Sequence, residues 1–121
     1  MPSPDTRTTC RIYGIKNCDT MKKAFAWLET NAITFEFIDY KKAGVVDAHL
    51  PDWNRRAGWN VLLNTRGLMW KRLSDEERSD MNEAKALALM CDYPTLIKRP
   101  VLDNGNRLLV GFDPELYKME L

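Results

Sequence analysis

The stretch that decides the fold is residues 9–40, which read TCRIYGIKNCDTMKKAFAWLETNAITFEFIDY. Residues 9–13 are rich in β-branched and aromatic side chains, which is typical of a strand, and residues 14–17 predict a tight exit loop. From residue 18 to 31, apolar side chains recur at helical intervals along one stripe: Met21, Ala24, Phe25, Trp27 and Leu28. Residues 33–40 return to strand character. A strand, a helix and a strand within about thirty residues predict a βαβ unit with parallel strands.

The middle of the chain, residues 47–92, places apolar residues at helical intervals, with breaks at Gly58 and at residues 65–67. Ser74 followed by Glu77 predicts a capping box at a helix start. The Ala- and Leu-rich residues 84–90 favour a helix. Pro94 marks the end of that helix, or follows it shortly.

The last third of the chain predicts strands again. Residues 99–102 and 107–110 flank the sequence DNGN, whose Asn-Gly pair is a strong signal for a β-hairpin. Asp113 and Pro114 fit the N-cap and first position of a final helix. The whole order is βαβ, a helical block, then ββα, so we expect an α/β fold.

Composition narrows the function classes. The 121 residues suit one domain, and 45% hydrophobic with 29% charged residues suit a packed core. The net charge of +1 argues against a nucleic-acid binder that works by bulk charge. No apolar run is long enough to cross a bilayer, and the first ten residues contain no apolar segment of a secretory signal. The three cysteines form no dense disulfide pattern, so we expect free thiols in a reducing cytoplasm.

The sequence contains no motif that indicates a metal-binding or phosphate-binding site. His49 is the only histidine, and no two cysteines have the close spacing of structural zinc ligands. The sequence holds no glycine-rich phosphate loop and no G-x-S-x-G motif. We therefore expect no metal site and look for chemistry among cysteines, lysines and arginines.

Cys18 is the candidate nucleophile, because it lies where the first loop becomes a helix. A thiolate there would face the unpaired amides of the first helical turn and the positive end of the helix dipole. This matters because a free thiol, with a pKa of about 8.5, is only roughly 3% ionised at pH 7. Lys16, Lys22 and Lys23 add positive charge, and Asp19 opposes them. The alternative is an inert residue at a helix N-cap, and for Cys10 and Cys91 we expect buried structural thiols.

Arg99-Pro100 is the second candidate feature. X-Pro bonds are the usual place for a cis peptide, and a guanidinium beside a thiolate can bind an oxyanion or a carboxylate. The alternative is a proline that begins an edge strand, preceded by an exposed arginine.

Four segments together resemble a known family: YGIKNCDTMKKAFAWLE, FEFIDYKKAG, LLNTRGLMWKRL and LIKRPVL. In this order they are similar to the ArsC/Spx group of thioredoxin-fold proteins, and most of all to its YffB-like branch. The resemblance extends from about Cys10 to Leu116. It implies a single ArsC-like domain over residues 1–121, with a thioredoxin-like core at 9–43 and 94–121 and a helical insertion at 44–93.

The resemblance also implies roles for residues. Cys18 corresponds to the nucleophile of the arsenate reductases, Arg99 to an arginine that contacts the oxyanion, and Pro100 to the adjoining cis-proline that presents backbone beside the sulfur. Two further site arginines of those reductases are absent or displaced. At one of these positions Asn64 follows a Leu-Leu pair, with Arg66 two residues later, and at the other the Gly111-Phe112 region replaces the arginine.

The function that the resemblance implies is a cytoplasmic, glutathione-dependent thiol oxidoreductase. Spx-like regulators often carry C-x-x-C, but the third position after Cys18 is Met21, and a single cysteine suits a mixed disulfide resolved by a second thiol. We expect no bound cofactor, glutathione as co-substrate, a disulfide or oxidised thiol as substrate, glutaredoxin as a partner and a monomeric chain. Candidates to hold the carboxylates of glutathione are Lys16, Asn17, Asn64, Arg66 and Arg99. The alternatives are an Spx-like adaptor that binds RNA polymerase without turnover, and a true arsenate reductase.

Overall fold

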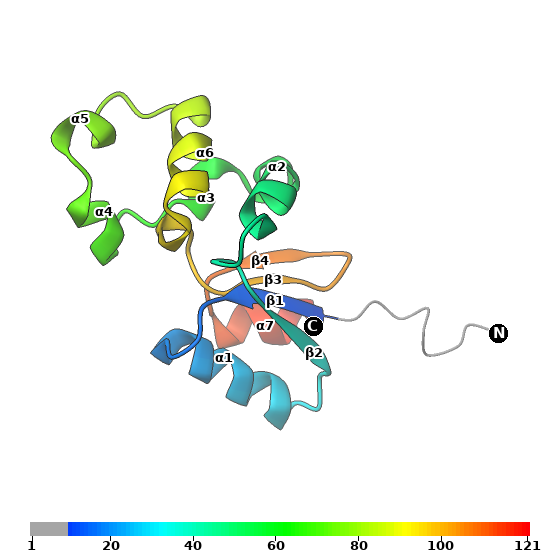
Figure 1. Cartoon of the computed structure of the whole chain (residues 1–121). Helices are drawn as coiled ribbons and strands as arrows, with labels where there is room; N and C mark the ends of the chain where they lie inside the picture. The colour runs from blue at the N-terminus through cyan, green and yellow to red at the C-terminus, as the bar shows by residue number, and fades with distance from the viewer. Residues whose placement is uncertain (1–9) are drawn as a thin grey trace. The chain divides into compact units, whose positions relative to one another are not determined.

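The computed structural model describes residues 10–121 (Figure 1), so Thr9 of the predicted first strand and the lead-in before it lie outside the described residues. The chain divides into two compact units. The first joins the residues up to Asp39 with Arg99–Leu121, and the second is Tyr40–Lys98. No helix of the described residues combines the length and the apolarity that a membrane span requires.

The first unit is a mixed four-stranded sheet with two helices. Its elements are β1 (Cys10–Gly14), α1 (Asp19–Thr30), β2 (Phe35–Asp39), β3 (Val101–Asp103), β4 (Leu108–Val110) and α7 (Pro114–Glu120). The strand order is β2-β1-β3-β4, with β1 parallel to β2 and antiparallel to β3, and β3 antiparallel to β4. The predicted βαβ unit, the hairpin and the α/β class are therefore confirmed.

Local signals explain these elements. The hairpin turn contains Gly105 at φ 90°, a left-handed conformation that glycine adopts without a steric penalty. Asp103 Oδ1 accepts a hydrogen bond from the Gly105 amide at 2.8 Å and so closes the turn. At α7, Asp113 is the N-cap and accepts a hydrogen bond from the Glu115 amide at 3.0 Å, with Pro114 at the first position as predicted.

Gly14 corrects the sequence analysis, which placed it in the exit loop. It is the last residue of β1 and pairs with Asp39 in the parallel ladder. The prediction failed because glycine usually ends strands, whereas here it permits close packing with a neighbouring side chain, and a glycine within a strand often marks such an approach. The loop that leads to the candidate nucleophile therefore begins at Ile15.

The core of the first unit lies between the sheet and its two helices, α1 and α7, which Figure 1 shows on the same face of the sheet. The buried side chains of this core are Cys10, Ile12, Met21, Ala24, Leu28, Leu102, Leu109 and Tyr117. The predicted apolar stripe of α1 supplies three of them: Met21, Ala24 and Leu28. Full burial of one such large apolar side chain contributes about 1.5–3 kcal/mol, so this stripe fixes α1 against the sheet.

The second unit is helical. Its elements are α2 (Val45–Ala57), α3 (Trp59–Leu62), α4 (Leu68–Arg72), α5 (Asp75–Arg78), α6 (Glu83–Asp92) and the 3₁₀ helix η2 (Pro94–Leu96). The predicted capping box begins α5: the Glu77 amide donates to Ser74 Oγ at 3.0 Å, and the Ser74 amide donates to Glu77 Oε1 at 2.8 Å. Pro94 follows the end of α6, as one of the two predicted placements requires, and begins η2.

Candidate active site

Cys18 is the N-cap residue of α1 and has an extended backbone, with φ −111° and ψ 129°. Its carbonyl accepts the first helical hydrogen bond, from the Lys22 amide at 3.0 Å. Asn17 precedes it in the left-handed region, at φ 59°, which asparagine tolerates better than most residues. This left-handed residue turns the chain from the loop into α1. The Cys18 side chain thereby takes the N-cap position, next to the free amides of the first helical turn.

Arg99 lies beside this sulfur, although 81 residues separate the two in sequence. Its Nε donates to Cys18 Sγ at 3.5 Å. The sheet explains the approach: Val101 of β3 pairs with Tyr13 of β1, so the residue that leads into β3 lies at the end of β1 that leads to Cys18. The topology thus builds a thiol-guanidinium pair from two distant segments.

The environment of Cys18 has opposing effects on its pKa. Partial burial of the sulfur is the largest single influence and raises the pKa. The hydrogen bond from Arg99, the amides of Met21 and Thr20, and the charge of the guanidinium all stabilise the thiolate. Together these outweigh the burial, and the pKa of Cys18 is lowered below that of an ordinary thiol.

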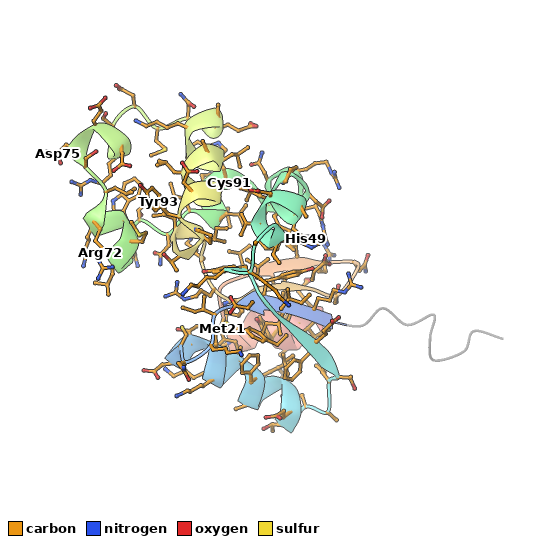
Figure 2. All side chains as sticks on the ribbon, viewed as in Figure 1. Met21, His49, Arg72, Asp75, Cys91 and Tyr93 are labelled. Carbon is orange, nitrogen blue, oxygen red and sulfur yellow. The ribbon has the colours of Figure 1, made fainter. Side chains whose placement is uncertain are left out.

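The other two thiols differ from Cys18. All three cysteines are free in the structure. Burial, and then the charge of Asp103, raise the pKa of Cys10. Burial, a hydrogen bond to Asp47 and nearby acidic charge raise the pKa of Cys91 to about 11; Figure 2 shows this residue on α6. Because the thiolate is the nucleophilic form, Cys18 is the best suited of the three cysteines to act as a nucleophile.

Pro100 is buried and follows Arg99 across a cis peptide bond, as the sequence predicts. Its carbonyl accepts a hydrogen bond from the Gly111 amide at 2.8 Å. This bond ties the start of β3 to the end of β4 and fixes the backbone next to Arg99.

The remaining predicted site residues fall into two groups. Lys16 and Asn17 are exposed in the loop directly before Cys18. Asn64 and Arg66 belong to the second unit, in the turn between α3 and α4, where the Arg66 amide donates to Asn64 Oδ1 at 3.0 Å. The Asn64 amide donates to the Leu96 carbonyl at 2.8 Å, so its backbone is fixed while Arg66 is exposed.

The described residues offer no evident metal centre, since residues 10–121 contain no group of three or more His, Cys, Asp or Glu arranged to hold an ion. The groups that the site brings together are one sulfur, the amides near it and a guanidinium. Such a set can generate and hold a thiolate, and it can bind an anionic group beside it.

Comparison with known families decides the relationship. Residues 13–119 match the ArsC family over most of the chain. The chain belongs to the ArsC family. The solved structure of the YffB protein is 45% identical, with a TM-score of 0.87, and the match covers 93% of this chain and 99% of that one.

Other relatives of this chain support the same family assignment. The solution structure of an arsenate reductase-related protein from Brucella melitensis is 41% identical, with a TM-score of 0.77, covering 99% of this chain and 98% of that one. An uncharacterized protein from Haemophilus influenzae is 36% identical over 107 residues, which are 88% of this chain and 94% of that protein. The global transcriptional regulator Spx 2 of Bacillus anthracis is 26% identical over 112 residues, which are 86% of this chain and 80% of the regulator. This ArsC protein thus has the thioredoxin-like α/β fold and is related both to arsenate reductases, which are redox enzymes, and to Spx regulators.

The contact of Met21 with Gly14 is one feature of the site that the sequence pattern does not predict. Met21 is fully buried, and a Cβ added to Gly14 would overlap its Sδ atom. The sequence feature that could have indicated this contact is a glycine at the end of a strand, seven residues before a methionine on the apolar stripe of the helix. A glycine in that place indicates a close approach but does not say which side chain makes it.

Proposed function

We propose that this chain is a glutathione-dependent thiol oxidoreductase in which Cys18 is the single nucleophile. The observation that carries the proposal is the position of its sulfur, which faces the Thr20 and Met21 amides and lies 3.5 Å from Arg99 Nε. Because its pKa is lowered, more of this thiol is ionised at a given pH than of an ordinary cysteine, and the proposed reaction uses no separate general base.

The proposed reaction is a pair of thiol-disulfide exchanges. The Cys18 thiolate attacks the glutathione sulfur of a mixed disulfide between glutathione and a substrate thiol. A Cys18-glutathione disulfide forms, and the substrate sulfur leaves as a thiolate that takes a proton from water. A second glutathione, as its thiolate, then attacks the glutathione sulfur bound to Cys18. Oxidised glutathione leaves, Cys18 returns as a thiolate, and the substrate has gained the two electrons.

The second thiol comes from outside the chain in this proposal. Cys10 begins β1 and Cys18 follows its other end, and four strand steps of roughly 3.3 Å separate those ends by about 13 Å. A disulfide needs Cα atoms within about 7 Å, which makes Cys10 a poor resolving residue. Cys91 is held as a protonated thiol by Asp47, which makes it a poor attacking group at neutral pH. Free glutathione supplies the missing thiol.

Charged and polar groups near Cys18 suit a small anionic thiol. Arg99 offers a guanidinium next to the sulfur, and Lys16 and Asn17 are exposed in the adjacent loop. We assign these three to the carboxylates of glutathione, and Pro100 to the backbone that lines the sulfur. Asn64 and Arg66 are proposed to bind the same carboxylates. The proposal places the protein in the cytoplasm as a monomer, with glutaredoxin as an alternative thiol donor.

The test is a turnover assay with a glutathionylated peptide and reduced glutathione, in which glutathione reductase and NADPH report oxidised glutathione. The parent chain is expected to turn over, Cys18→Ser to lose turnover, and Cys91→Ser to retain it as the matched control. Full turnover by Cys18→Ser would contradict the proposal.

A second candidate function is an adaptor that binds RNA polymerase without turnover. The relationship to a global transcriptional regulator, Spx 2, favours it. Capture of purified RNA polymerase by the full chain, together with an ordinary pKa at Cys18 and no turnover, would support the adaptor over the oxidoreductase.

Arsenate reduction is the third candidate, favoured by the relationship to an arsenate reductase-related protein. It needs cations in place of the two displaced site arginines, and Arg66 is the nearest in sequence to one of them. Arsenate turnover with glutathione and glutaredoxin, lost in Arg66→Gln, would establish it.

A further inference from the structure

The first turn of α1 carries the amides that face Cys18, yet most of its side chains point to solvent. Within Asp19–Lys23, all of which the structure describes, Met21 alone is buried, and its exposed fraction is 0%. Figure 2 shows Met21 between α1 and the sheet. The attachment of this turn to the rest of the unit therefore depends on one side chain.

Met21 packs against the backbone of β1 at the one position that has no side chain. A Cβ on Gly14 would overlap Met21 Sδ and would lie 2.5 Å from its Cε and 3.4 Å from its Cγ. Gly14 is not among the glycines with positive φ, so its backbone conformation alone would admit another residue. A side chain at this position would therefore have to displace the end of the Met21 side chain.

Met21 also occupies the third position of the helix after the Cys18 N-cap, and its own amide is one of the two that stabilise the Cys18 thiolate. N-cap side chains accept hydrogen bonds from the amides of the second or third residue, so the orientation of these two amides controls what the sulfur meets. The same residue thus supplies an amide to the site and anchors the turn that carries it.

We propose that Met21 is a positioning residue for Cys18: its side chain, packed on the bare Cα of Gly14, holds the first turn of α1 so that the Thr20 and Met21 amides face the sulfur. The inference rests on the proposed function, since it assumes that the Cys18 thiolate is the reacting group. It also gives a physical reason why methionine stands three residues after the nucleophile: the position is used to fix the helix terminus.

The test compares Met21→Ala with Leu28→Ala. Both residues are fully buried on the same stripe of α1 and in the same core, but Leu28 lies about three helical turns from Cys18. Iodoacetamide labelling across a pH series, followed residue by residue with mass spectrometry, reports Cys18 in each full-length variant. Chemical denaturation reports the stability of the same samples.

We expect both variants to unfold at lower denaturant. Of the two, only Met21→Ala should shift the Cys18 labelling curve to higher pH and slow labelling at pH 7, by about three- to tenfold, because the Thr20 and Met21 amides would then stabilise the thiolate less. Met21→Leu, which restores the apolar volume, should return most of the parent rate. Gly14→Ala should shift the curve in the same direction as Met21→Ala, because its methyl group displaces the Met21 side chain without changing residue 21 itself. It keeps the test available if Met21→Ala does not fold.

Two results would overturn the inference: a parent-like curve in Met21→Ala and Gly14→Ala, or an equal shift in Leu28→Ala. The proposed function fails separately. If the parent labels with a low midpoint and Met21→Ala shifts it, but the parent shows no turnover with glutathione, the positioning role stands and the oxidoreductase does not. If the parent Cys18 labels like a free thiol, both are wrong.

Discussion

Removal of the Arg99 guanidinium should reduce the fraction of Cys18 that is ionised, without reducing the reactivity of the thiolate once it has formed. In Arg99→Gln the donor that lies 3.5 Å from the sulfur and its positive charge are both lost, so the thiolate loses stabilisation and the pKa of Cys18 rises. A hydrogen bond to a charged group contributes about 1.5–3 kcal/mol. Both side chains are only partly buried, so the lower end applies, and about 1.5 kcal/mol corresponds to roughly tenfold less thiolate at pH values below the pKa.

The assay is the rate of Cys18 alkylation from pH 5 to pH 10, resolved by residue. At pH 6 the Arg99→Gln rate should fall about tenfold, whereas at pH 10 the two rates should converge, because both thiols are then ionised. At that upper end the variant should be equal or slightly faster, since nucleophilicity rises with pKa. Arg107→Gln is the matched control: it removes the same charge from the same unit, but that guanidinium pairs with Glu120 at 2.9 Å. Superimposable curves for parent and Arg99→Gln would refute the role given to Arg99.

Three further predictions concern single residues. The pKa of Cys91 is raised to about 11, so the protonated thiol contributes to the free energy of unfolding below the ordinary thiol value near 9, and this contribution is lost as the pH rises toward 11. Urea denaturation over this pH range should show the decline in stability. Cys91→Ser, which keeps a donor for Asp47, should flatten it. Asn17 has φ 59°, so Asn17→Val should lower the free energy of unfolding by about 1–2 kcal/mol, while Asn17→Gly should not. A higher KM for glutathione in Asn17→Gly would show that the asparagine side chain takes part in binding. An unchanged KM would show that it does not. Ser74→Ala should cost about 1 kcal/mol in thermal unfolding through loss of the capping box of α5, and Ser74→Asp should recover most of it; no change on Ser74→Ala would show that the cap does not stabilise the fold.

The parts of the fold that could be predicted are those set by short-range patterns. The apolar stripe of α1, the Asn-Gly turn and the Ser74-Glu77 box each involve residues within about two helical turns or one hairpin, so the sequence carries the signal locally. The sequence pattern misplaced Gly14 because the space for a side chain at this position is occupied by Met21, seven residues later. Local propensity alone would end the strand before it.

The candidate site could be predicted only in part, because its central contact is not local. The position of Cys18 at a helix start follows from the sequence pattern, and so do the amides that face it. Its pairing with Arg99 depends on β3 lying beside β1, and nothing in the spacing of the chain encodes that order; the family resemblance supplied the expectation. The anchoring by Met21 was seen only as part of an apolar stripe, since periodicity shows that a residue is buried but not what it touches.

The central claim is that Cys18 is ionised at neutral pH while the other thiols are not. The most direct measurement is the ultraviolet absorbance of thiolate as a function of pH, recorded for the parent chain and for Cys18→Ser, so that the difference isolates one sulfur from the tyrosines and from Cys10 and Cys91. The account predicts a difference curve with its midpoint below that of a free thiol and largely complete before the ordinary thiol range. A midpoint at or above the free-thiol value would contradict it.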